Sequence, residues 1–126
     1  MKQEIISIII LLVLDLLWIS LFMKQRYQRE IKGIQGSEMK VNVLYATLSY
    51  ILMVVGLIIF VLPNIRSEHR LLDSLKYGFL FGIVVYGIYD FTAAAVFSKW
   101  NMTTAVMDML WGGTVFFLTA YFGTYF

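Results

Sequence analysis

The stretch MDMLWGG, residues 107–113, and its counterpart LDLLW, residues 14–18, decide how this chain folds. Each places an aspartate three residues before a tryptophan, and each lies inside an apolar run long enough to cross a membrane. A third acid, Asp90, follows Tyr89 in another such run. Because burying a carboxyl group in hydrocarbon costs free energy, these acids need an explanation and the leucines around them do not.

The composition indicates one integral membrane domain, residues 1–126. The chain is 60% hydrophobic and 14% charged, whereas about a quarter of the residues in soluble domains are charged. A soluble domain of this size could not bury so much apolar surface, so lipid has to cover it. With no cysteine and a single histidine, His69, the sequence offers neither thiolate nor imidazole-rich sites. We therefore predict no metal and no cofactor.

Four apolar runs predict four transmembrane helices. They cover about 5–23, 41–62, 75–98 and 102–122, each close to the ~20 residues that cross the hydrocarbon layer. A lone span must satisfy its own backbone hydrogen bonds, so each run is expected to form a helix. The connections are short, with Pro63-Asn64 ending the second helix and 99–101 forming a tight turn. The predicted fold is an all-α integral membrane four-helix bundle with antiparallel neighbours.

The charged connections predict how the bundle sits in the membrane. Residues 24–35 carry Tyr27, Ile31 and Ile34 at helical spacing, which indicates an amphipathic extension of the first helix. The first and third connections hold six Lys and Arg residues, and the termini and second connection hold four. The positive-inside rule then places the first and third connections in the cytoplasm and the termini outside. These charges suit contact with membrane lipid and do not form a nucleic-acid footprint.

The rise per residue of a helix predicts that every helix carries a polar group at a similar depth in the membrane. Measured from the face with the first and third connections, Asp15 and Asp90 each lie about nine residues deep, roughly 13 Å. Asp108 lies roughly 10 Å deep, and Ser49 and Tyr50 of the second helix roughly 12–13 Å. We therefore expect the three acids to share one layer of the bilayer, with Ser49 and Tyr50 as supporting groups.

The repeated aspartate–tryptophan spacing predicts specific pairs. The first and fourth helices are antiparallel, so side-by-side packing brings Asp15 level with Trp111 and Asp108 level with Trp18. Each indole N–H could then donate to the carboxyl of the other helix, since buried indoles and acids both need hydrogen-bond partners. Tyr89 is a further supporting group next to Asp90. Small residues are expected to let the helices pack closely; they are Gly78, Gly82, Gly87, Gly112 and Gly113.

Taken together, these motifs resemble the domain of unknown function 2177 family of small membrane proteins. The resemblance rests on LDLLW (14–18), Tyr27, Tyr50 with Gly56, YDFT (89–92) and DMLWG (108–112), and covers nearly the whole chain. It implies a four-helix membrane protein without an established activity, with signature positions at Asp15, Trp18, Tyr89, Asp90, Asp108, Trp111 and Gly112. The chain departs from the family pattern at Ala93, where the pattern has an asparagine, so any polar site there lacks one amide.

Three functions remain open from the sequence. The acids could be structural, each hydrogen bond to a tryptophan or tyrosine being worth roughly 0.6–2 kcal/mol in a membrane, as in an assembly subunit. They could bind or translocate protons or cations, because burial and mutual repulsion favour neutral carboxyls that exchange protons. Asp90 and Asp108 are then the exchanging groups and Asp15 closes the cluster. A tightly packed bundle leaves little room for a pore, so transport would require a homo-oligomer.

The third function is an intramembrane enzyme or lipid-binding protein. Two of the acids could act as general acid and base on a lipidic substrate, or share a divalent metal through oxygen ligands. The sequence carries no nucleophile motif, phosphate-binding loop or dinucleotide fingerprint, which makes an enzyme the less favoured interpretation.

Overall fold

The protein is described by a computed structural model that covers residues 2–18, 20, 43–97 and 101–125. Within these ranges every regular element is a helix, which confirms the all-α class. The elements are α1 (Lys2–Leu17), α3 (Val43–Gly56), η2 (Leu57–Val61), η3 (Leu62–Asn64), η4 (Ser67–His69), α4 (Arg70–Asp73), η5 (Ser74–Phe79), α5 (Leu80–Val96) and α6 (Met102–Gly123). The predicted amphipathic extension at 24–35 lies outside the described residues.

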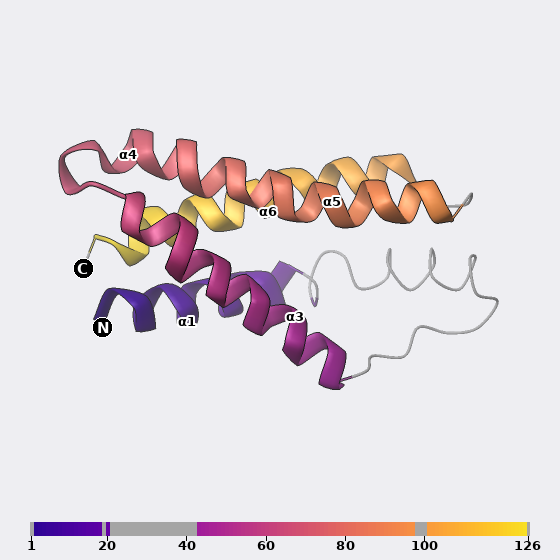
Figure 1. The fold of residues 1–126 in the computed structure, drawn as a ribbon, viewed down its shortest axis with the longest axis horizontal. Coiled ribbons are helices and arrows are strands. Elements are labelled where there is room, and N and C mark those ends of the chain that lie inside the picture. The colour runs from indigo at the N-terminus through magenta and orange to yellow at the C-terminus, as the bar shows by residue number, and fades with distance from the viewer. Residues whose placement is uncertain (1, 19, 21–42, 98–100, 126) are drawn as a thin grey trace.

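Three continuous helices are long and apolar enough to cross a membrane by length and composition: Val43–Asn64, Ser67–Val96 and Met102–Gly123. The described part of α1 contributes a fourth, shorter helix of 16 residues. Figure 1 shows α1, α5 and α6 running along the long axis and α3 crossing it obliquely, with both chain termini and the connection between α3 and α4 at one end. This arrangement is the four-helix unit that the apolar runs predict.

The third helix begins earlier than the expected 75–98. It starts with η4 at Ser67 and continues through α4 and the π-helical segment η5 into α5. The backbone N–H and guanidinium of Arg66 both donate to the Asp73 carboxylate, with the backbone N–H 2.9 Å from Oδ2. These hydrogen bonds and the charge of Asp73 raise the pKa of Arg66. The hydrogen bonds between Arg66 and Asp73 hold the polar first turns of this helix, which the apolar run alone does not predict.

Close backbone contact joins α5 to α6. A Cβ at Gly82 would overlap the carbonyl group of Gly112, and a Cβ at Gly78 would lie 2.8 Å from the carbonyl oxygen of Phe116. The predicted role of these glycines in packing follows directly, since any side chain at Gly82 would occupy the space of the α6 backbone. The hairpin of α5 and α6 is therefore the rigid frame against which α1 and α3 pack.

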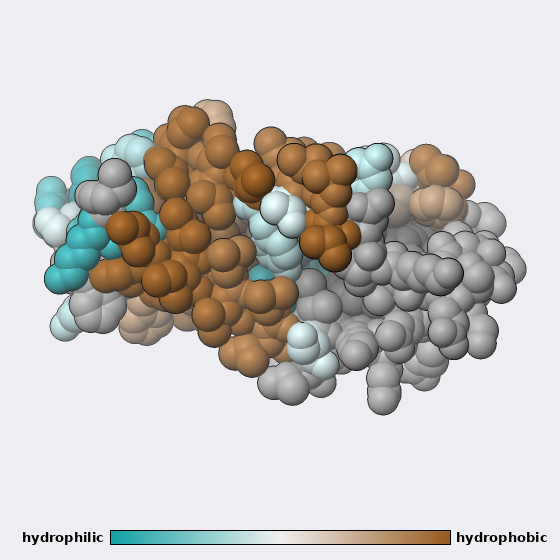
Figure 2. All heavy atoms as spheres, turned by 90° about the horizontal axis from the view of Figure 1, so that it is seen from below, coloured by the Kyte–Doolittle hydropathy of each residue, from teal (hydrophilic) through white to brown (hydrophobic). Residues whose placement is uncertain are grey.

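The apolar core lies in the half of the bundle that contains the termini. It consists of buried residues from α1, η2 and α6, namely Leu11, Leu57, Val61, Val115, Phe116 and Ala120. Most of α3 is exposed, and Figure 2 shows a broad apolar surface with hydrophilic residues gathered at the end that holds the termini. An apolar belt with a polar end is the surface expected of a protein surrounded by lipid.

Candidate functional site

The carboxylate of Asp15 is the point where the described helices meet. Its side chain is 4% exposed and accepts three hydrogen bonds. Tyr50 of α3 donates to Oδ2 at 2.7 Å, Tyr86 of α5 donates to Oδ1 at 2.8 Å, and the indole N–H of Trp111 on α6 donates to Oδ1 at 3.1 Å. One acid of α1 is thus bound to each of the other three long helices.

Helical spacing on α1 explains why Asp15 points into the bundle. The buried residues of this helix are Ser7, Leu11 and Asp15, which recur every four residues and share one face. Leu11 belongs to the apolar core one turn away. Packing of this stripe against α6 therefore fixes the height and direction of the carboxylate.

The indole of Trp111 reaches Asp15, which confirms the pair expected from the repeated spacing. Its ring also stacks on Trp18, with centroids 4.7 Å apart and planes 8° from parallel. The two tryptophans of the repeated motif thus meet face to face. The other expected pair, between Trp18 and Asp108, stays a prediction.

The other two acids are buried on the facing helices α5 and α6. Asp90 is 0% exposed and Asp108 is 5% exposed. Asp90 follows Tyr86 by four residues, and Asp108 precedes Trp111 by three. Along their own helices the two acids therefore lie about one turn, roughly 5 Å, nearer to the connection of α5 with α6 than Tyr86 and Trp111 do. These positions on α5 and α6 do not fix the depth of Asp15 on α1, because tyrosine and tryptophan side chains carry their donor groups away from their own backbone. The shared layer for the three acids stays a prediction.

The supporting residues differ in part from those predicted. Tyr50 contacts Asp15, but its neighbour Ser49 is exposed on α3 and does not face the acids. Tyr89, next to Asp90 on α5, is 59% exposed. The prediction missed Tyr86, which supplies one of the three donors. Its position four residues before Asp90 puts both on one helix face, and that spacing could have identified it.

The hydrogen bonds around Asp15 allow two protonation states. When the carboxyl is ionised, all three neighbours donate to it. When it is protonated, its own O–H can donate to the hydroxyl oxygen of Tyr50, because a tyrosine hydroxyl both donates and accepts. Trp111 donates only, so it stays on Oδ1 in both states. Rotation of one hydroxyl group therefore lets Tyr50 bond to either form of the Asp15 carboxyl.

The described contacts of Asp15 are all with N–H and O–H donors. Three hydrogen bonds already occupy the Asp15 oxygens. Nowhere in the described ranges do three or more His, Cys, Asp or Glu side chains gather as a metal site would require. A carboxylate surrounded by N–H and O–H donors is arranged to stabilise negative charge without a cation.

Substitution of Trp111 by phenylalanine tests the indole hydrogen bond. The phenyl ring can still stack on Trp18, but the donor to Asp15 is lost. We expect the free energy of unfolding in mild detergent to fall by about 0.6–1.7 kcal/mol, the range for polar contacts between membrane helices. In an Asp15→Leu background the same substitution should cost nothing further. An equal cost in both backgrounds would mean that ring packing, not the hydrogen bond, is responsible.

Comparison with known proteins agrees with the membrane fold. Residues 1–125 match a family described as "Predicted membrane protein (DUF2177)". No curated protein and no solved structure matches the chain.

Proposed function

Because this chain belongs to the DUF2177 family of predicted membrane proteins, a bilayer is the setting in which its acids act, and we propose that it binds and exchanges protons there. Asp15, Asp90 and Asp108 are the proton-binding groups, and Tyr50, Tyr86 and Trp111 hold Asp15 in place. The family supplies no activity, so the proposal rests on the chemistry of the buried acids.

The observation that carries this proposal is the set of donors around Asp15. No basic residue pairs with this acid in the described part of the chain, and all its partners are neutral. A buried carboxylate without a counter-ion is costly, and none of these three partners supplies a positive charge. Tyr50 can donate to the ionised form or accept from the protonated form, so a hydrogen bond between it and Asp15 can persist in both.

Asp90 and Asp108 extend the site toward the connection of α5 with α6. Both are buried, one helical turn along the chain from the Asp15 donors Tyr86 and Trp111, so the same helices carry two further carboxyls. Intramembrane acids of this kind mark proton relays in other membrane proteins. Net transport would need access from both sides of the bilayer, and a homo-oligomer of this tightly packed unit could provide it.

A structural role for the acids is the second candidate, favoured by one observation. The donors to Asp15 come from α3, α5 and α6, so the same hydrogen bonds would hold the four helices together without any proton exchange. Such a protein would serve as a scaffold or assembly subunit, with membrane lipid as its surroundings.

Asparagine at position 15 separates the two candidates. Its amide oxygen can accept from Tyr86 and Trp111, and its N–H can donate to Tyr50, so the contacts remain while titration is lost. We expect infrared difference spectra of the wild type in lipid, recorded across a pH series, to show carboxylic acid bands that gain and lose intensity. Asp15→Asn should remove one of these bands. Asp90→Asn and Asp108→Asn should each alter the remaining carboxylic acid bands.

The outcome decides the role of the site. A wild type whose intramembrane carboxyls stay in one protonation state across the accessible pH range would rule out proton exchange and leave the scaffold. If bands titrate, proton flux in liposomes under gradients of both signs then tests transport, with Asp15→Asn as the folded control.

A further inference from the structure

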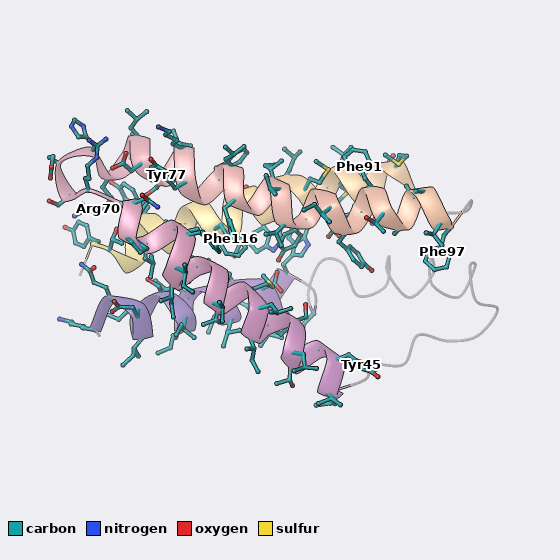
Figure 3. The ribbon with its side chains drawn as sticks, in the orientation of Figure 1. Tyr45, Arg70, Tyr77, Phe91, Phe97 and Phe116 are labelled. Atoms are coloured by element: carbon teal, nitrogen blue, oxygen red, sulfur yellow. The ribbon has the colours of Figure 1, made fainter. Side chains whose placement is uncertain are left out.

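Arg70 holds an unusual position at the end of the bundle where the chain termini lie (Figure 3). It is the first residue of α4, and its guanidinium carbon lies 5.1 Å from the ring centroid of Tyr125 and 5.9 Å from that of Tyr121. Its Nε is buried and makes no hydrogen bond to any residue that the structure describes. Two aromatic rings therefore position this cation, but its Nε–H is not used within the described protein.

The nearby acids are already engaged. Both oxygens of Asp73 accept from Arg66, and Glu68 accepts from the hydroxyl of Ser67 at 3.0 Å. No ion pair to Arg70 occurs among the residues that are described. The positive charge of Arg70 is therefore left for a partner from outside this part of the chain.

The depth of Arg70 indicates what that partner is. The residue lies four positions into the apolar helix Ser67–Val96, while Tyr121 and the neighbouring Tyr125 close the apolar helix Met102–Gly123. Tyrosines at the ends of membrane helices sit at the level of the lipid headgroups. At this level, phosphate is the abundant anion, and the planar fork of a guanidinium binds two phosphate oxygens at once.

We propose that Arg70, with the rings of Tyr121 and Tyr125, forms a binding site for the phosphate group of an anionic phospholipid. The rings hold the guanidinium flat by cation–π contact, which reduces the conformational entropy lost when lipid binds. The glycerol backbone and acyl chains would continue onto the apolar surface of the bundle. This site is separate from the buried acids and does not depend on proton exchange there.

Lipid retention in nanodiscs tests the site. Native mass spectrometry would measure binding of phosphatidylglycerol and of phosphatidylcholine to the wild type, Arg70→Gln and Lys76→Gln. Lys76 is the matched control, since it is an exposed cation near the same end. We expect Arg70→Gln to weaken phosphatidylglycerol binding by about tenfold or more, because charge-assisted hydrogen bonds to the phosphate are lost, and Lys76→Gln to weaken it by no more than about fivefold, the general effect of one basic residue at a membrane surface. Phosphatidylcholine binding should not respond to either.

Two more measurements separate a phospholipid site from a free-phosphate site and from diffuse surface charge. Tyr125→Leu keeps the charge but removes a ring and should also weaken phosphatidylglycerol binding, and this variant decides the matter if Arg70→Gln does not fold. Added inorganic phosphate should not displace the lipid; displacement would mean that the site takes free phosphate. Equal losses in Arg70→Gln and Lys76→Gln would overturn the proposal in favour of diffuse surface charge.

Discussion

Replacing Asp15 by leucine should destabilise the bundle more than any other single change in the site. Leucine is close in size but removes both acceptor oxygens at once. The hydroxyls of Tyr50 and Tyr86 and the indole N–H of Trp111 then lose the acceptor they share. At about 0.6–1.7 kcal/mol for each contact between membrane helices, the free energy of unfolding should fall by about 2–5 kcal/mol.

Asp15→Asn is the matched control for this substitution. It retains an acceptor for Tyr86 and Trp111 and a donor for Tyr50, so we expect a loss within about 1 kcal/mol. Reversible unfolding in mixed detergent micelles would measure both variants. Near-ultraviolet circular dichroism would report the stacked pair of Trp18 and Trp111, which lies beside the acid. The signal should change in Asp15→Leu and persist in Asp15→Asn.

Two contrary results are informative. If leucine and asparagine both cost less than about 1 kcal/mol, the three hydrogen bonds do not hold the helices together, and the scaffold role is wrong. If asparagine costs about 2–5 kcal/mol, as expected of leucine, the negative charge itself stabilises the fold, and Asp15 must be ionised in the native state. The second result would exclude Asp15 as a proton-exchanging group and leave Asp90 and Asp108 in that role.

The pair of Asp15 and Trp111 could be predicted from sequence because it depends on one periodicity. Two antiparallel helices that carry the same acid-to-tryptophan spacing must bring each acid level with the opposite indole once they pack side by side. The structure bears this out for Asp15. Predicting this contact requires no information about the loops, the lipid or the other helices, and for that reason the sequence was sufficient.

The contribution of Tyr86 required information that spacing alone does not give. A tyrosine carries its hydroxyl far from the backbone, so its partner depends on how α1 and α5 are placed relative to each other. That placement depends on how each of them packs on α6, α5 through the contact of Gly82 with Gly112 and α1 through its own buried face. Ser49, which is exposed on α3, differs from Tyr50 for a related reason, since the rotation of α3 about its axis decides which of the two positions faces Asp15.

The start of the third helix was hidden by its polarity. Hydropathy detects the residues that lipid covers, and the first turns of this helix carry Glu68, Arg70 and Asp73. They extend the helix beyond the apolar run because Arg66 and Asp73 close its first turns by hydrogen bonds. Apolar length therefore gives the membrane-spanning part of a helix and leaves its polar end undetermined.

The second large effect is expected from Gly82→Ala, a change of one methyl group. The added Cβ would overlap the backbone carbonyl of Gly112, which cannot move aside as a flexible side chain could. Alanine is the better helix former by about 1 kcal/mol, so the steric cost has to exceed that gain. We expect a net loss of about 2–3 kcal/mol in the free energy of unfolding, at the upper end of overpacking in a close-packed core.

Gly87→Ala is the matched control because it makes the same chemical change on the same helix. There the new Cβ meets the terminal methyl of Met109 at 3.1 Å, which is the far end of a flexible side chain. This variant should be neutral or slightly stabilised. Since Tyr86 and Trp111 lie next to the contact of Gly82 with Gly112, only Gly82→Ala should also alter the near-ultraviolet signal of the tryptophan pair. Equal stability of the two variants would mean that α5 and α6 do not approach as closely in lipid, and that the frame holding Asp15 is set elsewhere.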